Sequence, residues 1–274
     1  MRLAASNIAW QRAQDDAVAR ILTELGFAGV EIAPTAIWPK PLEASAQEVR
    51  AYRQEWESRG LPIVAMQALL FGRLDLTLFG DATTRAATRE YLAGIIRLGG
   101  QLGAKALVFG SPKNRQAGNL PRAQAEEIAC EFFHALGEVA VEHGTALCVE
   151  PNPTVYACDF VTTAREGLEL VRKVGSKGFC LHLDAGGITL SQEPVDDALK
   201  ESMRVARHFH ASEAQLAPLG SGTVAHEHFA SALRETGYDR WVSVEMRSIA
   251  EDTDLSRLRA ALEAARKAYG DARA

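Results

Sequence analysis

The sequence lacks the features of a membrane protein or of a disulfide-rich scaffold. It has only 4 cysteines, none in C-x-x-C spacing, and Cys148 and Cys180 sit in apolar runs where a thiol acts as a small hydrophobic group. We therefore expect neither a disulfide framework nor a thiolate zinc site. No apolar run approaches the length of a membrane span, and the N-terminus has no charged leader followed by an apolar core. These absences predict a cytoplasmic protein without a membrane partner.

An excess of charge of one sign is also lacking. The 30 basic and 35 acidic residues give a net charge of −5, which offers no electrostatic basis for binding nucleic acid. No linker rich in proline, glycine and serine interrupts the chain, and no tract is of low complexity. We therefore expect one domain spanning residues 1–274 that acts on a small molecule, with assembly into a homo-oligomer left open.

Short apolar runs alternate regularly with helical patterns along the chain. The runs predict eight strands, at Leu3–Trp10, Gly29–Pro34, Pro62–Leu69, Ala106–Ser111, Ala146–Asn152, Phe179–Gly186, Val205–Ser212 and Trp241–Met246. Helical patterns lie between them, for example at Asp16–Leu25, Thr84–Leu102, Pro121–His143 and Thr162–Val174. Alternation of this kind requires a parallel sheet, and eight units in this length favour closure. The predicted fold is α/β, a single (β/α)8 TIM barrel.

The helical patterns are weakest after the second strand and near Pro194–Ser202. A loop at residues 35–47 carries Trp38 and Pro39 before the second helix is expected to begin. Loops of this position in a barrel lie over its mouth, where they commonly form lids. We therefore expect this loop to cover part of the substrate site.

Four of the later apolar runs end in an ionisable residue: Glu150, Asp184, His210 and Glu245. Such residues at the ends of buried strands are costly unless they are paired or ligated. Barrel enzymes gather their functional side chains at the carboxyl ends of the strands, so these four are predicted to share one side of the rim. Three carboxylates and one imidazole suit one hard divalent cation, with manganese favoured and magnesium, cobalt or zinc as alternatives. The competing interpretation is that each is a rim group satisfied by hydrogen bonds.

Two of the predicted ligands, Glu150 and Glu245, can also act as an acid/base pair. The ion would polarise a carbonyl and stabilise an enediolate, while each glutamate ligates through one oxygen and exchanges protons through the other. This chemistry predicts an isomerase or epimerase of a sugar or keto-sugar. Loss of a hydroxyl would make the same site a dehydratase, with His182 or Tyr156 as the acid. A further alternative is a non-catalytic metal-binding barrel that serves as a subunit of another enzyme.

Other residues at or beyond strand ends are predicted to contact the substrate. They are Asn7, Trp10, Glu31, Trp38, Gln67, Lys113, Asn152, His182 and Arg247. The structural alternatives are core or lid packing for the tryptophans and a buried, hydrogen-bonded side chain for His182. The GSPKNR sequence further predicts Lys113, Asn114 and Arg115 at the rim, where cationic donors could bind a carboxylate or phosphate. A solvated basic turn is the alternative there.

The motifs VEPNP, HLDAGG, HFHAS and SVEM resemble those of the xylose-isomerase-like TIM-barrel superfamily. The resemblance is to its sugar phosphate isomerase/epimerase branch, with the D-tagatose/D-psicose 3-epimerases, hydroxypyruvate isomerases and inosose dehydratases, and it covers most of the chain. It implies that Glu150, Asp184, His210 and Glu245 ligate one divalent metal ion. It also implies that Glu150 and Glu245 are the acid/base pair.

Three positions depart from the ketose 3-epimerases that the chain resembles. Tyr156 stands where those enzymes have a glutamate, Gly187 where they have a histidine, and Leu216 where they have an arginine. The related endonuclease IV uses a histidine at the Gly187 position for a second metal, so a role in DNA repair is not expected. The resemblance therefore implies the reaction class more firmly than it implies the sugar.

Overall fold

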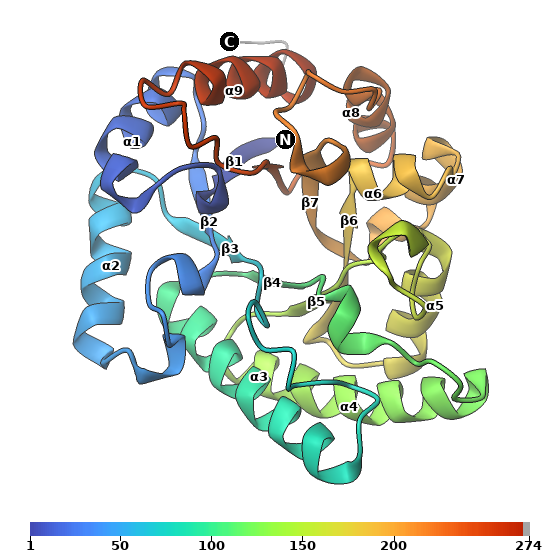
Figure 1. Cartoon of the computed structure of the whole chain (residues 1–274). Coiled ribbons are helices and arrows are strands. Elements are labelled where there is room, and N and C mark those ends of the chain that lie inside the picture. The colour runs from blue at the N-terminus through green and yellow to red at the C-terminus, as the bar shows by residue number, and fades with distance from the viewer. Residues whose placement is uncertain (271–274) are drawn as a thin grey trace.

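Eight short apolar segments form a closed, parallel β-barrel in the computed structural model, which describes residues 1–270 (Figure 1). The strands are β1 (Arg2–Ser6), β2 (Gly29–Ile32), β3 (Ile63–Met66), β4 (Ala106–Phe109), β5 (Leu147–Val149), β6 (Phe179–Asp184), β7 (Ala206–Ser212) and β8 (Trp241–Glu245). Each strand pairs with the next, and β8 closes the barrel on β1. The prediction of a single (β/α)8 barrel is confirmed. One domain over all 274 residues stays a prediction, because residues 271–274 lie outside the described part.

Helices form the outer layer of the barrel (Figure 1). They are α1 (Asp15–Glu24), α2 (Ala46–Ser58), α3 (Ala82–Leu102), α4 (Arg122–Glu142), α5 (Ala164–Val174), α6 (Ala185–Leu190), α7 (Val195–Lys200), α8 (His226–Glu235) and α9 (Ser256–Tyr269). Ser45 and Glu48 form a capping box at the start of α2, and Gly103 ends α3 with φ of 89°. Within residues 1–270, no helix is both long and apolar enough to cross a bilayer.

All of the predicted strands except the seventh end earlier than their apolar runs suggest, and the ends of the first and sixth have a clear cause. The first ends at Ser6, where the Asn7 side chain accepts a hydrogen bond from the Ala33 backbone N–H at 2.7 Å and holds the chain in a 3-10 turn. The sixth ends at Asp184, whose carboxylate accepts from the Gly187 backbone N–H and caps α6. The short helix α6 was not predicted from the sequence, because HLDAGG carries too few side chains to show helical periodicity.

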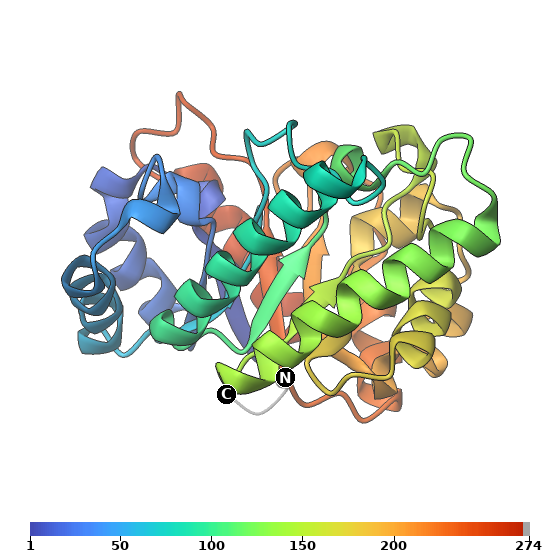
Figure 2. The same cartoon turned by 90° about the horizontal axis from the view of Figure 1, so that it is seen from below.

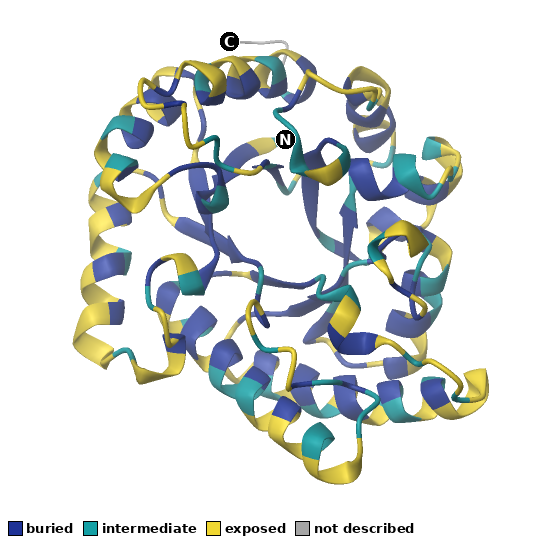
Figure 3. Ribbon diagram, viewed as in Figure 1, coloured by how far each residue is buried: buried dark blue, intermediate teal, exposed yellow. Residues whose placement is uncertain are grey.

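The loops that follow the strands gather on one side of the barrel, and this is the side on which the site lies. Figure 2 shows them along the upper edge of the molecule, with the N-terminus near the lower edge. In Figure 3 the strands are buried, whereas the outward faces of the helices are exposed. A cluster of small buried side chains that includes Ala4, Ala106 and Cys148 packs together, with Trp241 against it, near the amino ends of the strands. The polar side chains inside the barrel lie toward the carboxyl ends of the strands.

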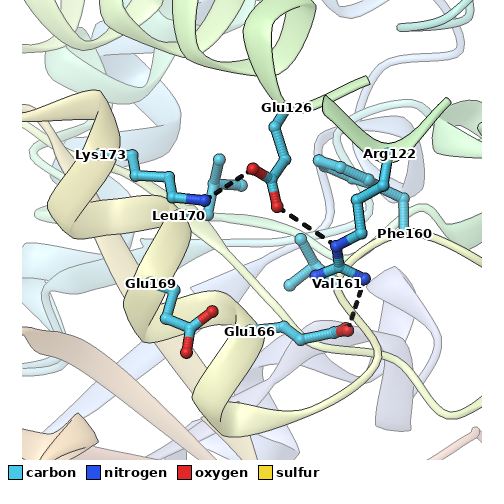
Figure 4. Close-up of a pocket in the computed structure, with 8 residues that line it drawn as sticks. All are labelled: Arg122, Glu126, Phe160, Val161, Glu166, Glu169, Leu170 and Lys173. Carbon is cyan, nitrogen blue, oxygen red and sulfur yellow. Dashed lines mark hydrogen bonds and ion pairs between the residues drawn. The ribbon is translucent and has the colours of Figure 1, made fainter. Parts of the chain in front are cut away.

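Exposed ion pairs join α4 to α5 on the outside of the barrel (Figure 4). Arg122 contacts Glu126 at 3.2 Å and Glu166 at 2.9 Å, and Lys173 contacts Glu126 at 2.6 Å. The hollow between them holds only about 10 Å³, which is no more than about one water molecule needs. This feature therefore links two helices and is too small to bind a substrate.

Candidate metal centre and substrate cleft

The four predicted metal ligands meet at the carboxyl end of the barrel. The register of the sheet places Asp184 beside His210, and Ser212 beside Glu245. One donor atom from each of Asp184, His210 and Glu245 lies within 4.8 Å of the other two. Glu150 follows β5, and its Oε1 is 3.9 Å from His210 Nδ1. The four side chains thus converge on one region, although their role as ligands stays a prediction.

The imidazole of His210 is oriented by a buried carboxylate on the far side of the barrel. Its Nε2 lies 2.8 Å from Glu31 Oε2, and both side chains are buried. With Nε2–H donating to Glu31, the ring directs Nδ1 toward the carboxylate cluster. Burial would lower the pKa of His210, but Glu31 and Glu245 outweigh it and raise that pKa well above its ordinary value, so a metal ion would bind Nδ1 in place of a proton. Nδ1 is buried without a hydrogen-bond partner and lies 3.3 Å from Glu245 Oε2. A carboxylate that holds the other nitrogen of a histidine is the usual outer partner of a metal-binding imidazole.

The electrostatics of the cluster also fit a cation. Burial and, after it, the charges of Glu150 and Glu245 raise the pKa of Asp184 to about 7. Burial likewise raises the pKa of Glu245 against the opposing effect of His210. Burial would raise the pKa of Glu150 too, but His182 and His210 outweigh it and hold that pKa at about 2. Negative charges crowded in a buried space repel one another, and a divalent cation would relieve that repulsion.

Two further contacts fix the position of Asp184. The Ser212 hydroxyl donates to Oδ2 at 2.6 Å, and the Gly187 backbone N–H donates to Oδ1. Ser212 was not among the predicted site residues, although its place two residues after His210 puts it on the same face of β7. Gly110 has a related role beside Glu150, because a Cβ at Gly110 would overlap Glu150 Oε2. The absence of a side chain there leaves room for the carboxylate.

Three buried side chains, Glu31, His182 and His208, lie inside the barrel beneath the cluster. Glu31 is fully buried, and although burial alone would raise its pKa, His210 and His208 hold that pKa well below its ordinary value. His182 lies with Nε2 3.3 Å from Glu150 Oε1, and burial together with His210 lowers its pKa to about 4. Both Glu31 and His182 were predicted to contact the substrate, but neither lines the cleft. The structure places them against the predicted ligands instead.

A cleft of about 850 Å³ opens above the cluster. Its floor includes Glu150, Asp184 and Glu245, and its walls come from the loops that follow β3, β4, β5, β7 and β8. Four of the predicted substrate contacts line it: Gln67, Lys113, Asn152 and Arg247. Of these, Gln67 and Asn152 are buried, whereas Lys113 and Arg247 are exposed at the rim. Their binding of a substrate stays a prediction.

The remaining three predicted contacts lie outside this cleft. The side chain of Asn7 holds the backbone at Ala33, as described above. The indole N–H of Trp10 donates to Asp15 at 2.7 Å, and its ring packs at 6.4 Å from that of Trp56. The ring of Trp38 makes an edge contact with Tyr52 at 5.5 Å between centroids. The loop at residues 35–47 therefore packs Trp38 against α2 and does not cover the cleft in this structure.

The GSPKNR segment is the clearest correction to the sequence analysis. Asn114 and Arg115 are buried, so the expectation that they offer donors to a ligand at the rim is wrong. Arg115 is fully buried, and its guanidinium donates to the backbone carbonyls of Phe109, Glu150, Phe160 and Val161. It ties the end of β4 to the end of β5 and to the loop beyond. Lys113 and Asn114 both line the cleft, but the Asn114 amide donates to the backbone carbonyls of Arg73 and Leu76, so of the three only Lys113 offers a cationic group there.

All three positions that depart from the ketose epimerases line the cleft: Tyr156, Gly187 and Leu216. The Tyr156 hydroxyl accepts a hydrogen bond from the Gln215 backbone N–H at 2.9 Å, which joins the loop after β5 to the loop after β7. Glu213, which the sequence analysis did not select, also lines the cleft. Its only sequence signal is its place three residues after His210.

Glu213 holds the glycine-containing loop that follows β7. Its carboxylate accepts from the backbone N–H groups of Gly220 and Val224 at 3.2 and 3.3 Å, and it lies 3.3 Å from His226 Nε2. A Cβ at Gly222 would overlap this carboxylate. The glycine at this position therefore allows the loop to close over a buried acid, and no phosphate-binding role is needed to explain it.

The fold agrees with the comparisons with known proteins. A family model described as the xylose isomerase-like TIM barrel matches residues 19–268, and the chain belongs to this family. A D-psicose 3-epimerase of Agrobacterium fabrum (strain C58) is 25% identical over 174 residues, which cover 60% of this chain and 58% of that enzyme. The chain thus matches less than two thirds of the length of this relative.

Solved structures match over nearly the whole chain. The 3-keto-D-glucoside 4-epimerase YcjR of E. coli has a TM-score of 0.79 at 19% identity, covering 97% of this chain and 99% of that one. A D-psicose 3-epimerase of Clostridium cellulolyticum H10, solved with D-tagatose, has a TM-score of 0.82 at 16% identity, covering 99% and 100%. The IOLI protein with a bound zinc atom has a TM-score of 0.73 at 18% identity, covering 98% and 96%. At these identities the similarity shows a shared fold.

Proposed function

We propose that this protein is a divalent-metal-dependent isomerase or epimerase that moves a proton beside the carbonyl of a sugar or keto-sugar. The observation that carries the proposal is the placing of Glu150 and Glu245. Both carboxylates line the cleft, and they approach His210 Nδ1 at 3.9 and 3.3 Å from strands three positions apart in the barrel. Two carboxylates beside one candidate ion are suited to proton transfer on two faces of a substrate. The epimerases among the relatives named above support the same class.

Glu150, Asp184, His210 and Glu245 would hold the ion. The unpartnered Nδ1 of His210 and the crowded carboxylates support this assignment. A set rich in oxygen with one imidazole favours manganese, with magnesium, cobalt or zinc as alternatives. When bound, the ion supplies positive charge that stabilises negative charge developing on the carbonyl and the neighbouring hydroxyl oxygen of the substrate.

The side chains of this protein would carry out the proton transfers. One of the two glutamates accepts the proton from the carbon next to the carbonyl, and the C–H electron pair moves toward the carbonyl oxygen to give an enediolate. The other glutamate, which begins the step protonated, donates its proton to the opposite face of that carbon in an epimerase. In an isomerase the proton goes instead to the carbon that bore the carbonyl, and the proton of the neighbouring hydroxyl moves to the former carbonyl oxygen. Gln67 and Asn152, whose amides line the inner cleft, would orient the hydroxyl groups.

A dehydratase is the second candidate, and Tyr156 is the observation that favours it. Its hydroxyl lines the cleft and accepts a hydrogen bond from Gln215 N–H, so its own proton is available to a leaving hydroxyl group. His182, the other acid considered from the sequence, is fully buried and does not line the cleft. Loss of water from a keto-sugar or inosose would be the distinguishing product.

The proposal is tested by hydrogen exchange at substrate carbon. The protein is incubated with Mn²⁺ in D₂O with a panel of ketoses, keto-sugars and inososes, and deuterium at the carbon beside the carbonyl is measured by NMR. We expect metal-dependent exchange that Glu150→Gln and Glu245→Gln each abolish, while substitution of an exposed carboxylate on α4, Glu127→Gln, leaves it unchanged. Exchange that survives both cleft variants would refute the acid/base pair. A protein that binds no metal and exchanges no substrate would instead support the non-catalytic barrel.

A further inference from the structure

The cleft extends beyond the carboxylates along an apolar wall. This wall is formed by Leu70, Phe71 and Leu74, all from the loop between β3 and α3. Phe71 is 71% exposed and Leu74 is 68% exposed. The other exposed large hydrophobic side chains among residues 1–270 are Leu42, Val141 and Val155, and none of these lines the cleft. Exposure of two such side chains at one rim is unfavourable in water and marks a contact surface.

The loop that carries this wall is held in a fixed conformation. The buried Asn114 amide donates to the backbone carbonyls of Arg73 and Leu76 at 2.7 and 2.6 Å, and the Leu78 N–H donates to the Asn114 carbonyl at 2.8 Å. The Arg73 guanidinium also lies 4.6 Å from the centre of the Tyr91 ring on α3. The exposed side chains are therefore presented by an anchored loop, so their exposure does not result from an unattached segment.

The size and polarity of the cleft indicate what this wall contacts. Its volume of about 850 Å³ lies toward the upper end of the roughly 300–1,000 Å³ typical of small-molecule sites, which is more than one sugar ring fills. Of the polar groups suited to a sugar, Asn152 lies at the carboxylate end, where its side chain hydrogen-bonds Glu150. We propose that the substrate is a keto-sugar that carries an apolar or aromatic aglycone, and that this aglycone packs against Leu70, Phe71 and Leu74. The placing of the sugar rests on the function proposed above.

A second copy of this chain is the competing occupant of the wall. The wall is continuous with the cleft that contains Glu150 and Glu245, so a group attached to a sugar at the carboxylates would reach it. A covering subunit would instead close the entrance to the same cleft. The continuity of the wall with the candidate catalytic groups therefore favours an extension of the substrate.

The test compares glycosides that differ only in the aglycone. Methyl, phenyl and hexyl glycosides of one keto-sugar, 3-keto-D-glucose, are titrated into the Mn²⁺-loaded protein, and their dissociation constants are measured by calorimetry. We expect the phenyl and hexyl compounds to bind roughly 10-fold more tightly than the methyl compound, because each buries additional apolar surface. The double variant with Phe71→Ser and Leu74→Ser should lose this preference. The control Val141→Ser, which changes an exposed apolar side chain on α4 outside the cleft, should retain it.

The outcomes separate this inference from the proposed function. Equal binding of the three glycosides, or a preference that the double variant retains, overturns the apolar subsite even where C–H exchange occurs. A preference lost in the double variant supports the subsite even where no substrate exchanges, in which case only the proposed reaction fails. Sedimentation velocity tests the competing occupant: a wild-type dimer that the double variant converts to a monomer, without any aglycone preference, would assign the wall to a subunit interface.

Discussion

Glu31 provides the most direct test of how the barrel interior prepares the candidate metal centre. Its Oε2 lies 2.8 Å from His210 Nε2, and neither side chain is more than 1% exposed. Substitution Glu31→Gln keeps an oxygen acceptor of the same size but removes the negative charge. The imidazole then becomes a weaker ligand, because its Nε2 proton is no longer drawn toward a carboxylate.

The expected magnitude follows from the burial of this pair. Loss of an outer partner of a metal ligand commonly reduces metal affinity by about 10–100-fold, which corresponds to about 1.4–2.7 kcal/mol. We expect Glu31→Gln to lie near the lower limit, because the amide oxygen still accepts the hydrogen bond. Glu31→Ala should lie near the upper limit, because it also leaves His210 Nε2 without an acceptor.

The assay is a calorimetric titration of the metal-free variants with Mn²⁺, with thermal unfolding followed in parallel. Asp15→Asn is the matched control, since Asp15 is also a buried carboxylate that accepts from an aromatic ring N–H at 2.7 Å, here that of Trp10. It should lower stability without changing Mn²⁺ affinity. Unchanged Mn²⁺ affinity in Glu31→Gln, with only a stability loss like that of the control, would show that Glu31 is structural and would refute the reasoning.

Three further outcomes are expected. His210→Ala should weaken Mn²⁺ binding by more than about 100-fold, seen as loss of metal after dialysis, and full retention of metal would remove His210 from the ligand set. Gly110→Ala should lower kcat by about 100-fold, because the new Cβ would displace the Glu150 carboxylate. The control Gly94→Ala, whose Cβ would meet only the Leu42 side chain, should have little effect on kcat. Equal kcat values in the two variants would contradict this explanation. Arg115→Lys should lower the free energy of unfolding, measured in urea, by about 2–3 kcal/mol, because one ammonium group cannot reach all four carbonyls. An unchanged midpoint of urea unfolding would contradict this structural role of Arg115.

The strands and the residues at their carboxyl ends could be predicted, because both depend on the local hydrophobic pattern of the sequence. Alternation of apolar runs with helical periodicity indicates a parallel barrel, and β-strand geometry determines which residues share a face. Glu150, Asp184, His210 and Glu245 could be selected on this basis, since each stands at the carboxyl end of its run. The register of neighbouring parallel strands then brings them together.

The depth of a side chain inside the barrel, and the course of each loop, were decided only by the tertiary structure. Glu31 and His210 meet across the barrel although 179 positions separate them in the chain. Trp10 packs against α2, and the Arg115 guanidinium is buried among carbonyls from three segments. Alternation along a strand fixes the face on which a residue lies, but not the side chains that arrive from other strands. A loop takes its conformation from such long-range partners, and the sequence near it carries no periodic signal of them.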